Sequence, residues 1–314
     1  MSAAAAPPLS PACWVLGGVR TPFAKAGTAL ARVPVSELGR IAVGEVLARH
    51  EVDGGRLDEV ILGNCAQPAE AANVARVAAL RAGVPARVPG FTVHRNCASG
   101  MEAVADGAYR IGCGAAHLVL AGGMESMSQI PLQYTHEYGL WLEGLMRAKT
   151  PLQKLGAFSR FRSAMLKPRI SLMEGPHDLT CGLTMGQTAE VLPREFRIPR
   201  ERQDEFALES HRRTIAARER LREEIVPVFA APSCEMVQDD VGPRDGQTLE
   251  ALAKLKPFFD RRNGTVTVGN SCPITDGAVA LLLGSDETAR SWPVPPLGRI
   301  RAFGFQTRMR GRLE

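Results

Sequence analysis

Long apolar runs are missing from this 314-residue chain. No segment approaches the roughly 20 apolar residues that a membrane-spanning helix needs. The first residues, MSAAAAPPLSPA, also lack the basic and then apolar order of a signal peptide. We therefore expect residues 1–12 to form a disordered tail and the protein to be cytoplasmic.

Paired cysteines and metal-ligand spacings are missing as well. The seven cysteines lie at positions 13, 65, 97, 113, 181, 234 and 272 and include no C-x-x-C pair. The six histidines are dispersed and form no H-x-x-x-H pattern. An odd, scattered set of thiols argues against a disulfide framework and fits a reducing compartment. We predict no metal and no bound cofactor.

Aromatic residues make up only 5% of the chain, and the net charge of +5 is modest. No helix-turn-helix, zinc-finger or RNP-like pattern accompanies the positive charge, so we predict no nucleic-acid partner. The apolar fraction of 45% and the charged fraction of 23% are ordinary for a globular protein. The length is enough for more than one structural unit.

The first part of the chain alternates between short apolar runs and helix-like segments, which predicts an α/β layered sheet. Ser36 is expected to cap the first helix, and Gly83 and Gly112 to end the second and third. The expected strands cover 13–18, 58–64, 90–96 and 117–123, and the expected helices cover 36–50, 72–83 and 97–112.

The character of the sequence changes after Pro131, where a long, polar, helix-rich stretch begins. Strand-like sequence returns as TVTVGN (265–270) and AVALLLG (278–284). We therefore expect a discontinuous α/β domain formed by 13–130 and 257–290, interrupted by a mainly helical inserted domain at 131–256. Within the insertion, a helix is expected over 200–224, with Pro199 near its first turn.

The segment 145–173 contains seven Lys or Arg and no acid before residue 174. Apolar residues recur in it every three or four positions, which predicts one helix with an apolar and a basic face. Such a helix can lie on an anionic membrane or dock a partner. The alternatives are a solvated face of a helix packed on its own domain, and attraction of coenzyme A phosphates.

Cys97 stands where the extended run PGFTVHRN changes into the helical stretch CASGMEAVADGAYRIG. A thiol at a strand-to-helix turn lies near free backbone N–H groups and the positive end of the helix dipole, which favour the thiolate. Cys97 is therefore a candidate nucleophile. The alternative is a buried cysteine that acts as a small apolar residue.

Several blocks of this sequence, in order, resemble those of the thiolase family. They are GVRTPFAK, GNCAQPAEAANVARVAAL, NCASGMEAV, HLVLAGGMESMSQIP, MGQTAE, IPRERQDEFALESHRR and GNSCPITDGAVALLLGS, and the resemblance runs from about Cys13 to about Arg301. It implies the layered fold of the thiolase N-terminal half with an inserted loop domain. It also implies a homo-oligomer.

The resemblance implies an acyltransferase in which Cys97 forms an acyl-thioester intermediate. The expected reaction is thiolytic cleavage of a 3-ketoacyl-CoA, or the Claisen condensation of acetyl-CoA in reverse, with coenzyme A as substrate rather than bound cofactor. By resemblance, Met185, Asn270 and Cys272 are candidate substrate-binding residues. Thr184 and Cys272 differ from the commonest thiolase pattern and favour thiolases of fatty-acid degradation.

Three thiolase motifs, G-H-P, C-x-G and N-E-A-F, do not occur in this sequence. Residues 291–314 begin like the junction that precedes the C-terminal half of the family, so we expect a truncated half and impaired activity. His94 is interpreted as a structural histidine, and His177 and His211 as surface residues. GGMESM and GNSCPITDG are interpreted as tight turns rather than phosphate loops.

Other readings of the sequence remain open. One is a non-catalytic thiolase remnant that binds acyl-CoA or a protein partner, and another is a reading frame that continues in the living protein. A third is a condensing enzyme like the ketoacyl synthases, which share the layered fold and a nucleophilic cysteine. The MESMSQ and NCASGME blocks favour the thiolase over the synthase.

Overall fold

A mixed seven-stranded sheet forms the centre of the molecule in a computed structural model that describes residues 12–175, 177–230, 232 and 234–305. The strand order is β11-β1-β10-β5-β3-β4, and β2 pairs with β10. Strands β3, β4 and β5 are parallel, whereas β10 is antiparallel to β5 and β1. The strands are β1 (Cys13–Arg20), β2 (Ala24–Lys25), β3 (Glu59–Gly63), β4 (Gly90–Val93), β5 (Leu118–Ser126), β10 (Thr275–Gly284) and β11 (Gly298–Ile300).

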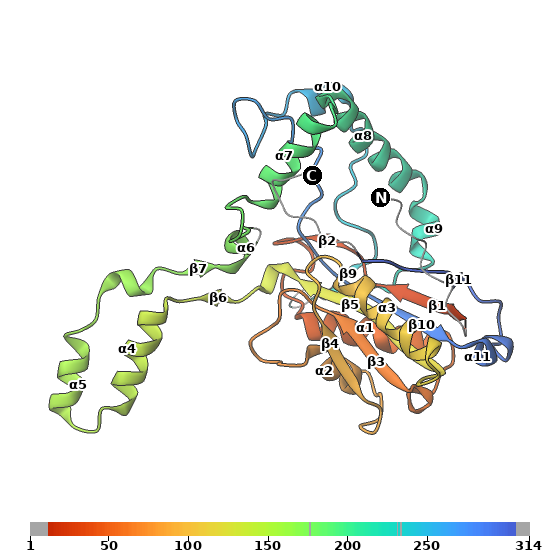
Figure 1. Cartoon of the computed structure of the whole chain (residues 1–314), viewed down its shortest axis with the longest axis horizontal. Coiled ribbons are helices and arrows are strands. Elements are labelled where there is room, and N and C mark those ends of the chain that lie inside the picture. Colours follow the sequence, from red (N-terminus) through yellow and green to blue (C-terminus); the bar gives the residue numbers. More distant parts are fainter. Residues whose placement is uncertain (1–11, 176, 231, 233, 306–314) are drawn as a thin grey trace.

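Helices cover both faces of this sheet (Figure 1). Helices α1 (Val35–Arg49) and α2 (Val74–Arg81) pack on one face, and α3 (Ser99–Gly112) packs on the other. The sheet residues alternate accordingly, since Leu118 and Leu120 belong to the α1–α2 core and Val119 and Ala121 to the α3 core. The short helix α11 (Asp286–Arg290) lies beside β1 and β10. The α/β layered fold is thus confirmed.

Three helix boundaries in this layer were predicted, at Ser36, Gly83 and Gly112. Ser36 does not cap α1, because Pro34 is the N-cap and its carbonyl accepts from the N–H groups of Glu37 and Leu38. Gly83 follows α2 with φ +89°, a left-handed conformation that glycine adopts easily. Gly112 is the last residue of α3, and the left-handed position after that helix is Gly114, with φ +74°.

The segment between β5 and β10 forms an arm above one end of the sheet (Figure 1). The long helix predicted at 200–224 is divided at Ala217 into α8 (Arg200–Ala216) and α9 (Arg218–Arg222). The arm contains helices α6 (Ser171–Glu174), α7 (Met185–Glu195), α8 (Arg200–Ala216), α9 (Arg218–Arg222) and α10 (Leu249–Ala253), and the hairpin β8 (Val228–Ala230) and β9 (Glu235–Val237). The short 3-10 helix η1 (Gly54–Arg56) precedes β3, and η2 (Met127–Gln129) follows β5 directly.

The strand predicted at 265–270 does not form. The buried Glu190 carboxylate of α7 accepts from the N–H groups of Thr265 (2.9 Å) and Val266 (3.0 Å), and Asn270 Oδ1 accepts from Thr267 N (2.7 Å). These backbone donors are therefore used by side chains, and the segment turns instead of joining a sheet.

The basic segment does not form the predicted single helix. Helices α4 (His136–Arg147) and α5 (Pro151–Phe158) make a helical hairpin that projects away from the sheet, followed by η3 (Ser163–Leu166) (Figure 1). The break has a local cause, because Thr150 and Gln153 form a capping box that starts a new helix at Pro151. The two-stranded neck of β6 (Leu132–Gln133) and β7 (Arg169–Ile170) joins the hairpin to the arm.

Candidate active site

Cys97 lies in the turn between β4 and α3, at the end of the sheet where the parallel strands β3, β4 and β5 finish. The helix begins two residues later, at Ser99, with Ala98 as its N-cap. The thiol is exposed, so the structure does not support the alternative of a buried apolar cysteine. Its place at the start of a helix is the one expected from the sequence.

The turn that carries Cys97 is fixed by its own hydrogen bonds. Ala98 N donates to Arg95 O, and Ser99 N donates to Asn96 O. The Ser99 hydroxyl accepts from Arg95 N (2.8 Å) and donates to Asn96 O (2.6 Å). Asn96 has φ +46°, a left-handed conformation that asparagine tolerates better than most residues. The thiol is therefore held on a preformed loop.

Backbone donors remain available beside this turn. Glu102 N donates to Ala98 O, whereas in the described part of the chain no backbone hydrogen bond is made by the N–H groups of Gly100 and Met101. Such first-turn N–H groups stabilise negative charge on a thiolate or an oxyanion. The arrangement is suited to acyl transfer.

Glycines let the start of α3 lie directly on the sheet. A Cβ atom at Gly63 would be 2.3 Å from the carbonyl carbon of Ser99 and 2.5 Å from Gly100 N. One at Gly123 would be 3.2 Å from Gly100 Cα. Gly63 and Gly123 are register partners on β3 and β5, so two adjacent strands supply the bare surface on which the helix begins.

A second turn, residues 64–66, follows β3 and is tied to the end of β5. Glu125 accepts hydrogen bonds from Cys65 N (2.8 Å), Ala66 N (3.0 Å) and Asn64 Nδ2 (2.9 Å). Asn64 is 2% exposed and also donates to Met124 O. Burial raises the pKa of Glu125, although these hydrogen bonds and the nearby His94 act in the opposite direction.

Cys65 lies close enough to Cys97 and Glu125 for both to act on its ionisation. Burial raises the pKa of the Cys65 thiol, and the charges of Glu125 and Cys97 raise it further. Cys13, which is fully buried in the α3 core, has its pKa raised to about 12 by burial. Thiols with raised pKa values are poor nucleophiles at neutral pH, so neither residue competes with the exposed Cys97.

The three candidate substrate-binding residues lie in the inserted arm or at its return to the sheet. Met185 begins α7 and is 44% exposed, and Cys272 is exposed before β10. Asn270 donates through Nδ2 to Asp204 Oδ1 (3.0 Å) and Thr265 O (3.1 Å). Among the described residues, no hydrogen bond, ion pair or ring contact joins any of the three to Cys97.

The histidines occupy varied surroundings. His94 is exposed rather than buried, and its Nδ1 accepts from Asn96 N (3.3 Å). His177 is exposed, and His211 is half-buried with Nδ1 accepting from Arg244 N (3.2 Å). Groups of three or more His, Cys, Asp or Glu that could hold a metal do not occur in the described ranges.

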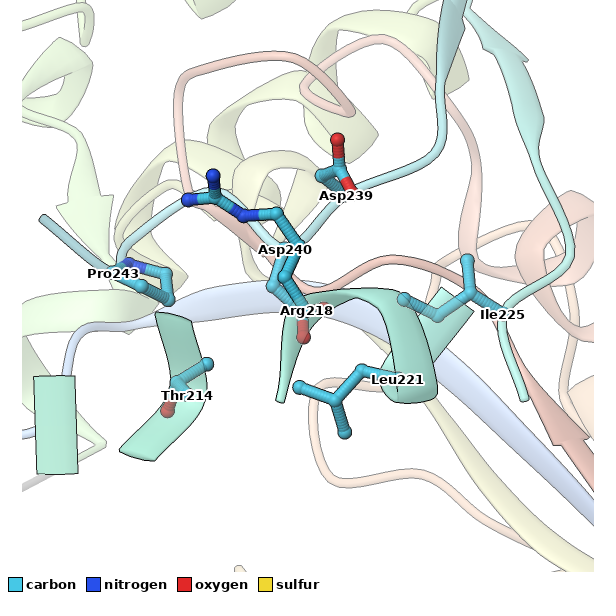
Figure 2. A pocket seen from close by; sticks show the side chains of 7 residues that line it. All are labelled: Thr214, Arg218, Leu221, Ile225, Asp239, Asp240 and Pro243. Carbon is cyan, nitrogen blue, oxygen red and sulfur yellow. The ribbon is translucent and has the colours of Figure 1, made fainter. Parts of the chain in front are cut away.

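A hollow lies between α8, α9 and the segment after β9, as Figure 2 shows, and none of the candidate site residues lines it. Two of its acids are held in ion pairs: Asp240 with Arg20 of β1 (2.7 Å) and Asp239 with Arg222 of α9 (2.7 Å). The pair of Asp240 with Arg20 ties the arm to the sheet, and the pair of Asp239 with Arg222 joins two segments of the arm, so we assign the hollow a structural role. Its lining comprises Thr214, Arg218, Leu221, Ile225, Asp239, Asp240 and Pro243.

Neither the 64–66 turn nor Glu125 was predicted from the sequence. GGMESM was predicted to form a tight turn, but β5 continues through this block to Ser126. Both features could have been found from the ends of the predicted strands β3 and β5, because the carboxyl ends of neighbouring parallel strands meet at one edge of a sheet. GNSCPITDG does contain the turn that Thr267 and Asn270 close, before β10 begins at Thr275.

Crossing a bilayer would take a longer and more apolar helix than any in the described part of the chain.

The comparison with known families and sequences points to one family. The family model described as "Thiolase, N-terminal domain" matches residues 13–287. A 3-ketoacyl-CoA thiolase of Yersinia pestis (strain Pestoides F) is 37% identical over 293 residues, which are 93% of this chain and 66% of that protein. The chain thus spans about two thirds of the length of the curated relatives that it matches.

Comparison with solved structures points to the same family. The crystal structure of the Bacillus anthracis acetyl-CoA acetyltransferase has a TM-score of 0.79 and 34% identity, covering 92% of this chain and 69% of that one. The human mitochondrial 3-ketoacyl-CoA thiolase in complex with CoA has a TM-score of 0.80 and 30% identity, covering 95% and 71%. With its sheet, its helical layers and the turn at Cys97, this chain belongs to the thiolase family and corresponds to the family's N-terminal domain.

Proposed function

We propose that this chain carries the acyl-accepting part of a thiolase-type acyltransferase, with Cys97 as the nucleophile. The exposed thiol on a fixed turn at the start of α3 is the observation that carries the proposal. The relatives named 3-ketoacyl-CoA thiolase and acetyl-CoA acetyltransferase support the substrate class. The structure of a relative in complex with CoA supports coenzyme A esters as ligands.

In the cleavage direction, the Cys97 thiolate attacks the 3-keto carbon of a 3-ketoacyl-CoA. The bond between C2 and C3 breaks, C2 takes a proton, and acetyl-CoA leaves. The acyl group then passes from Cys97 to the thiol of a second coenzyme A. In the condensation direction, Cys97 takes the acetyl group of acetyl-CoA and releases coenzyme A. A second acetyl-CoA loses a C2 proton to a solvent base, and its C2 attacks the acetyl carbonyl. The C–S bond to Cys97 breaks, acetoacetyl-CoA leaves, and the Cys97 thiolate is restored. N–H groups of the α3 first turn stabilise the oxyanions.

Thioester exchange tests this proposal without requiring carbon–carbon chemistry. Acetyl-CoA is incubated with the chain and isotopically labelled coenzyme A. If Cys97 accepts and returns the acetyl group, the label enters acetyl-CoA at a rate proportional to protein concentration. Binding of acetyl-CoA without exchange would instead favour the non-catalytic reading, in which the chain holds acyl-CoA or a partner.

Substrate contacts by Met185, Asn270 and Cys272 remain a proposal. Met185 and Cys272 have exposed side chains that can meet a ligand. Asn270 has its amide engaged in its own turn, so its proposed contribution is to hold the neighbouring Ser271 and Cys272 in place.

Four further expectations from the sequence stay predictions. They are the domain boundaries at 130, 256 and 290, the homo-oligomer, the role in fatty-acid degradation and the cytoplasmic location. The predicted tail, apart from residue 12, and residues 306–314 of the predicted truncated half lie outside the residues that the structure describes.

We also propose that the α4–α5 hairpin docks on an anionic membrane surface. Residues 136–170 contain seven Lys or Arg and two Glu, which gives +5, equal to the net charge of the whole chain. Exposed apolar side chains accompany the charge, including Met146 (80%), Leu152 (79%) and Leu155 (68%). Trp141 contacts Phe158 and Phe161, so the hairpin has its own small core and presents the other side chains outward.

Neutralising Lys154, Arg160 and Arg162 with glutamine is expected to weaken binding to phosphatidylglycerol-containing vesicles by about 100-fold, at roughly 1 kcal/mol per residue. Co-sedimentation measures it. The matched control replaces the exposed Arg202, Arg212 and Arg213 of α8 and keeps the parent affinity. Equal binding of parent and variant, or no preference over phosphatidylcholine vesicles, contradicts the proposal. Loss of coenzyme A binding in the hairpin variant would instead show attraction of phosphates.

A further inference from the structure

The 64–66 turn stands beside the nucleophile and is held by one carboxylate. Glu125 lies on the same face of β5 as Val119, Ala121 and Gly123, which is the face that α3 covers. Its position is two residues beyond Gly123, where the first turn of α3 meets the sheet. The side chain therefore belongs to the edge of the sheet at which Cys97 is presented.

Each oxygen of this carboxylate has a donor. Oε2 accepts from Cys65 N (2.8 Å), and Oε1 accepts from Ala66 N (3.0 Å) and Asn64 Nδ2 (2.9 Å). Asn64 adds a second connection, because its backbone N–H donates to Val93 O at the end of β4 (3.1 Å). Glu125 thus ties the residues after β3 to β5, and Asn64 ties them to β4, the strand that leads to Cys97.

Asn64 has one unsatisfied atom. Its Oδ1 is buried and has no hydrogen-bond partner, while its Nδ2 donates to Met124 O (3.0 Å) and Glu125 Oε1. Rotating the amide would place its oxygen against two acceptors, so the orientation is fixed by the carboxylate and the carbonyl. Moving the buried Asn64 amide would break the hydrogen bonds that its Nδ2 donates and leave further buried polar atoms without a partner.

We propose that Glu125 is a positioning residue for the Cys97 site, and that it acts by anchoring the 64–66 turn beside the nucleophile. The inference deepens the proposed function and rests on it only for the identity of the reaction. The anchored turn keeps Cys65 within electrostatic range of Cys97, and the carboxylate favours the protonated form of the Cys65 thiol. Cys97 then remains the reactive member of the pair. The titratable groups that face this cluster are Cys65, Cys97, Glu125 and His94.

The expected effect of Glu125→Gln follows from the donors. An amide has one acceptor oxygen in place of two, and its NH2 group faces N–H groups that also donate. At least one hydrogen bond to the turn is lost, and the negative charge beside Cys65 disappears. Because that charge contributes to the raised pKa of Cys65, its loss lowers the pKa and brings Cys65 thiolate formation to lower pH.

Alkylation with iodoacetamide, followed by peptide mapping over a pH series, measures this directly. In the parent, Cys97 is labelled at least about tenfold faster than Cys65 near neutral pH. In Glu125→Gln, the labelling profile of Cys65 moves to lower pH and the preference for Cys97 shrinks. A thermal melt verifies that the variant is folded, and acyl exchange in it falls about tenfold while the concentration of acetyl-CoA giving half-maximal rate changes little.

Glu59→Gln is the matched control. Glu59 is also a half-buried glutamate on a central strand, but it begins β3 and pairs with Arg110, so the labelling ratio stays at the parent value. If Glu125→Gln does not fold, Glu125→Asp keeps the charge but shortens the reach to the turn, and a reduced preference for Cys97 is expected. Parent-like labelling in a folded variant overturns the inference. Since alkylation needs no turnover, a failed exchange reaction in the parent would refute only the proposed function.

Discussion

Replacing Gly63 with alanine is expected to destabilise the protein by about 3 kcal/mol, at the upper end of the usual cost of overpacking. The new Cβ would lie 2.3 Å from the carbonyl carbon of Ser99, 2.4 Å from its oxygen and 2.5 Å from Gly100 N. All three are backbone atoms, so no side chain can rotate away. Either β3 or the first turn of α3 has to move, and with it the turn that carries Cys97.

Urea unfolding measures this effect as a lower midpoint at unchanged slope. Gly44→Ala is the control, because Gly44 lies inside α1 and an added Cβ there meets no atom within 4 Å. Alanine in that helix position is expected to raise stability by about 1 kcal/mol. A Gly63→Ala protein as stable as the parent would show that the helix start does not rest on the glycine surface of β3 and β5.

Changing Cys97 to serine is expected to reduce thioester exchange by at least about 1,000-fold. A serine hydroxyl is a weak nucleophile unless an adjacent base activates it, whereas a thiol supplies a fraction of thiolate at neutral pH. The substitution is small and the position is exposed, so the fold is retained. The rate is followed by the entry of labelled coenzyme A into acetyl-CoA.

Cys113→Ser supplies the comparison for this variant. Cys113 is also exposed, but it is the C-cap at the opposite end of α3, and its Sγ donates to Arg110 O (3.4 Å). Its removal is expected to leave exchange unchanged. Equal losses in the two variants would point to a general effect of thiol removal, and equal activity would assign the acyl group to another residue.

The core layer and the place of Cys97 in the turn before α3 could be predicted from sequence because local patterns determine them. Each central strand alternates between two apolar cores, and the change from an apolar run to small helical residues at Cys97 marks the turn itself. The reach of β5 was underestimated, since MES in GGMESM pairs with Gly277 and its neighbours on β10, a partner about 150 residues away.

The parts that the sequence did not predict depend on long-range side-chain contacts. The segment 265–270 has strand-like residues, but Glu190, 75 residues earlier, takes its backbone donors. Glu125 and the 64–66 turn are 60 residues apart in sequence and meet only because β3 and β5 are neighbours. The apolar periodicity of the basic segment predicted one helix, but it carries no information on caps, and the capping box at Thr150 starts a second helix there.

The proposed function requires a covalent acyl group at Cys97, so the decisive measurement is the mass of the folded chain after brief exposure to acetyl-CoA, followed by peptide mapping. We expect one acetyl group per chain, located on Cys97 and removed when coenzyme A is added. An unmodified folded chain, or an acetyl group that maps to another residue or resists coenzyme A, would contradict the proposal that Cys97 is the acyl acceptor.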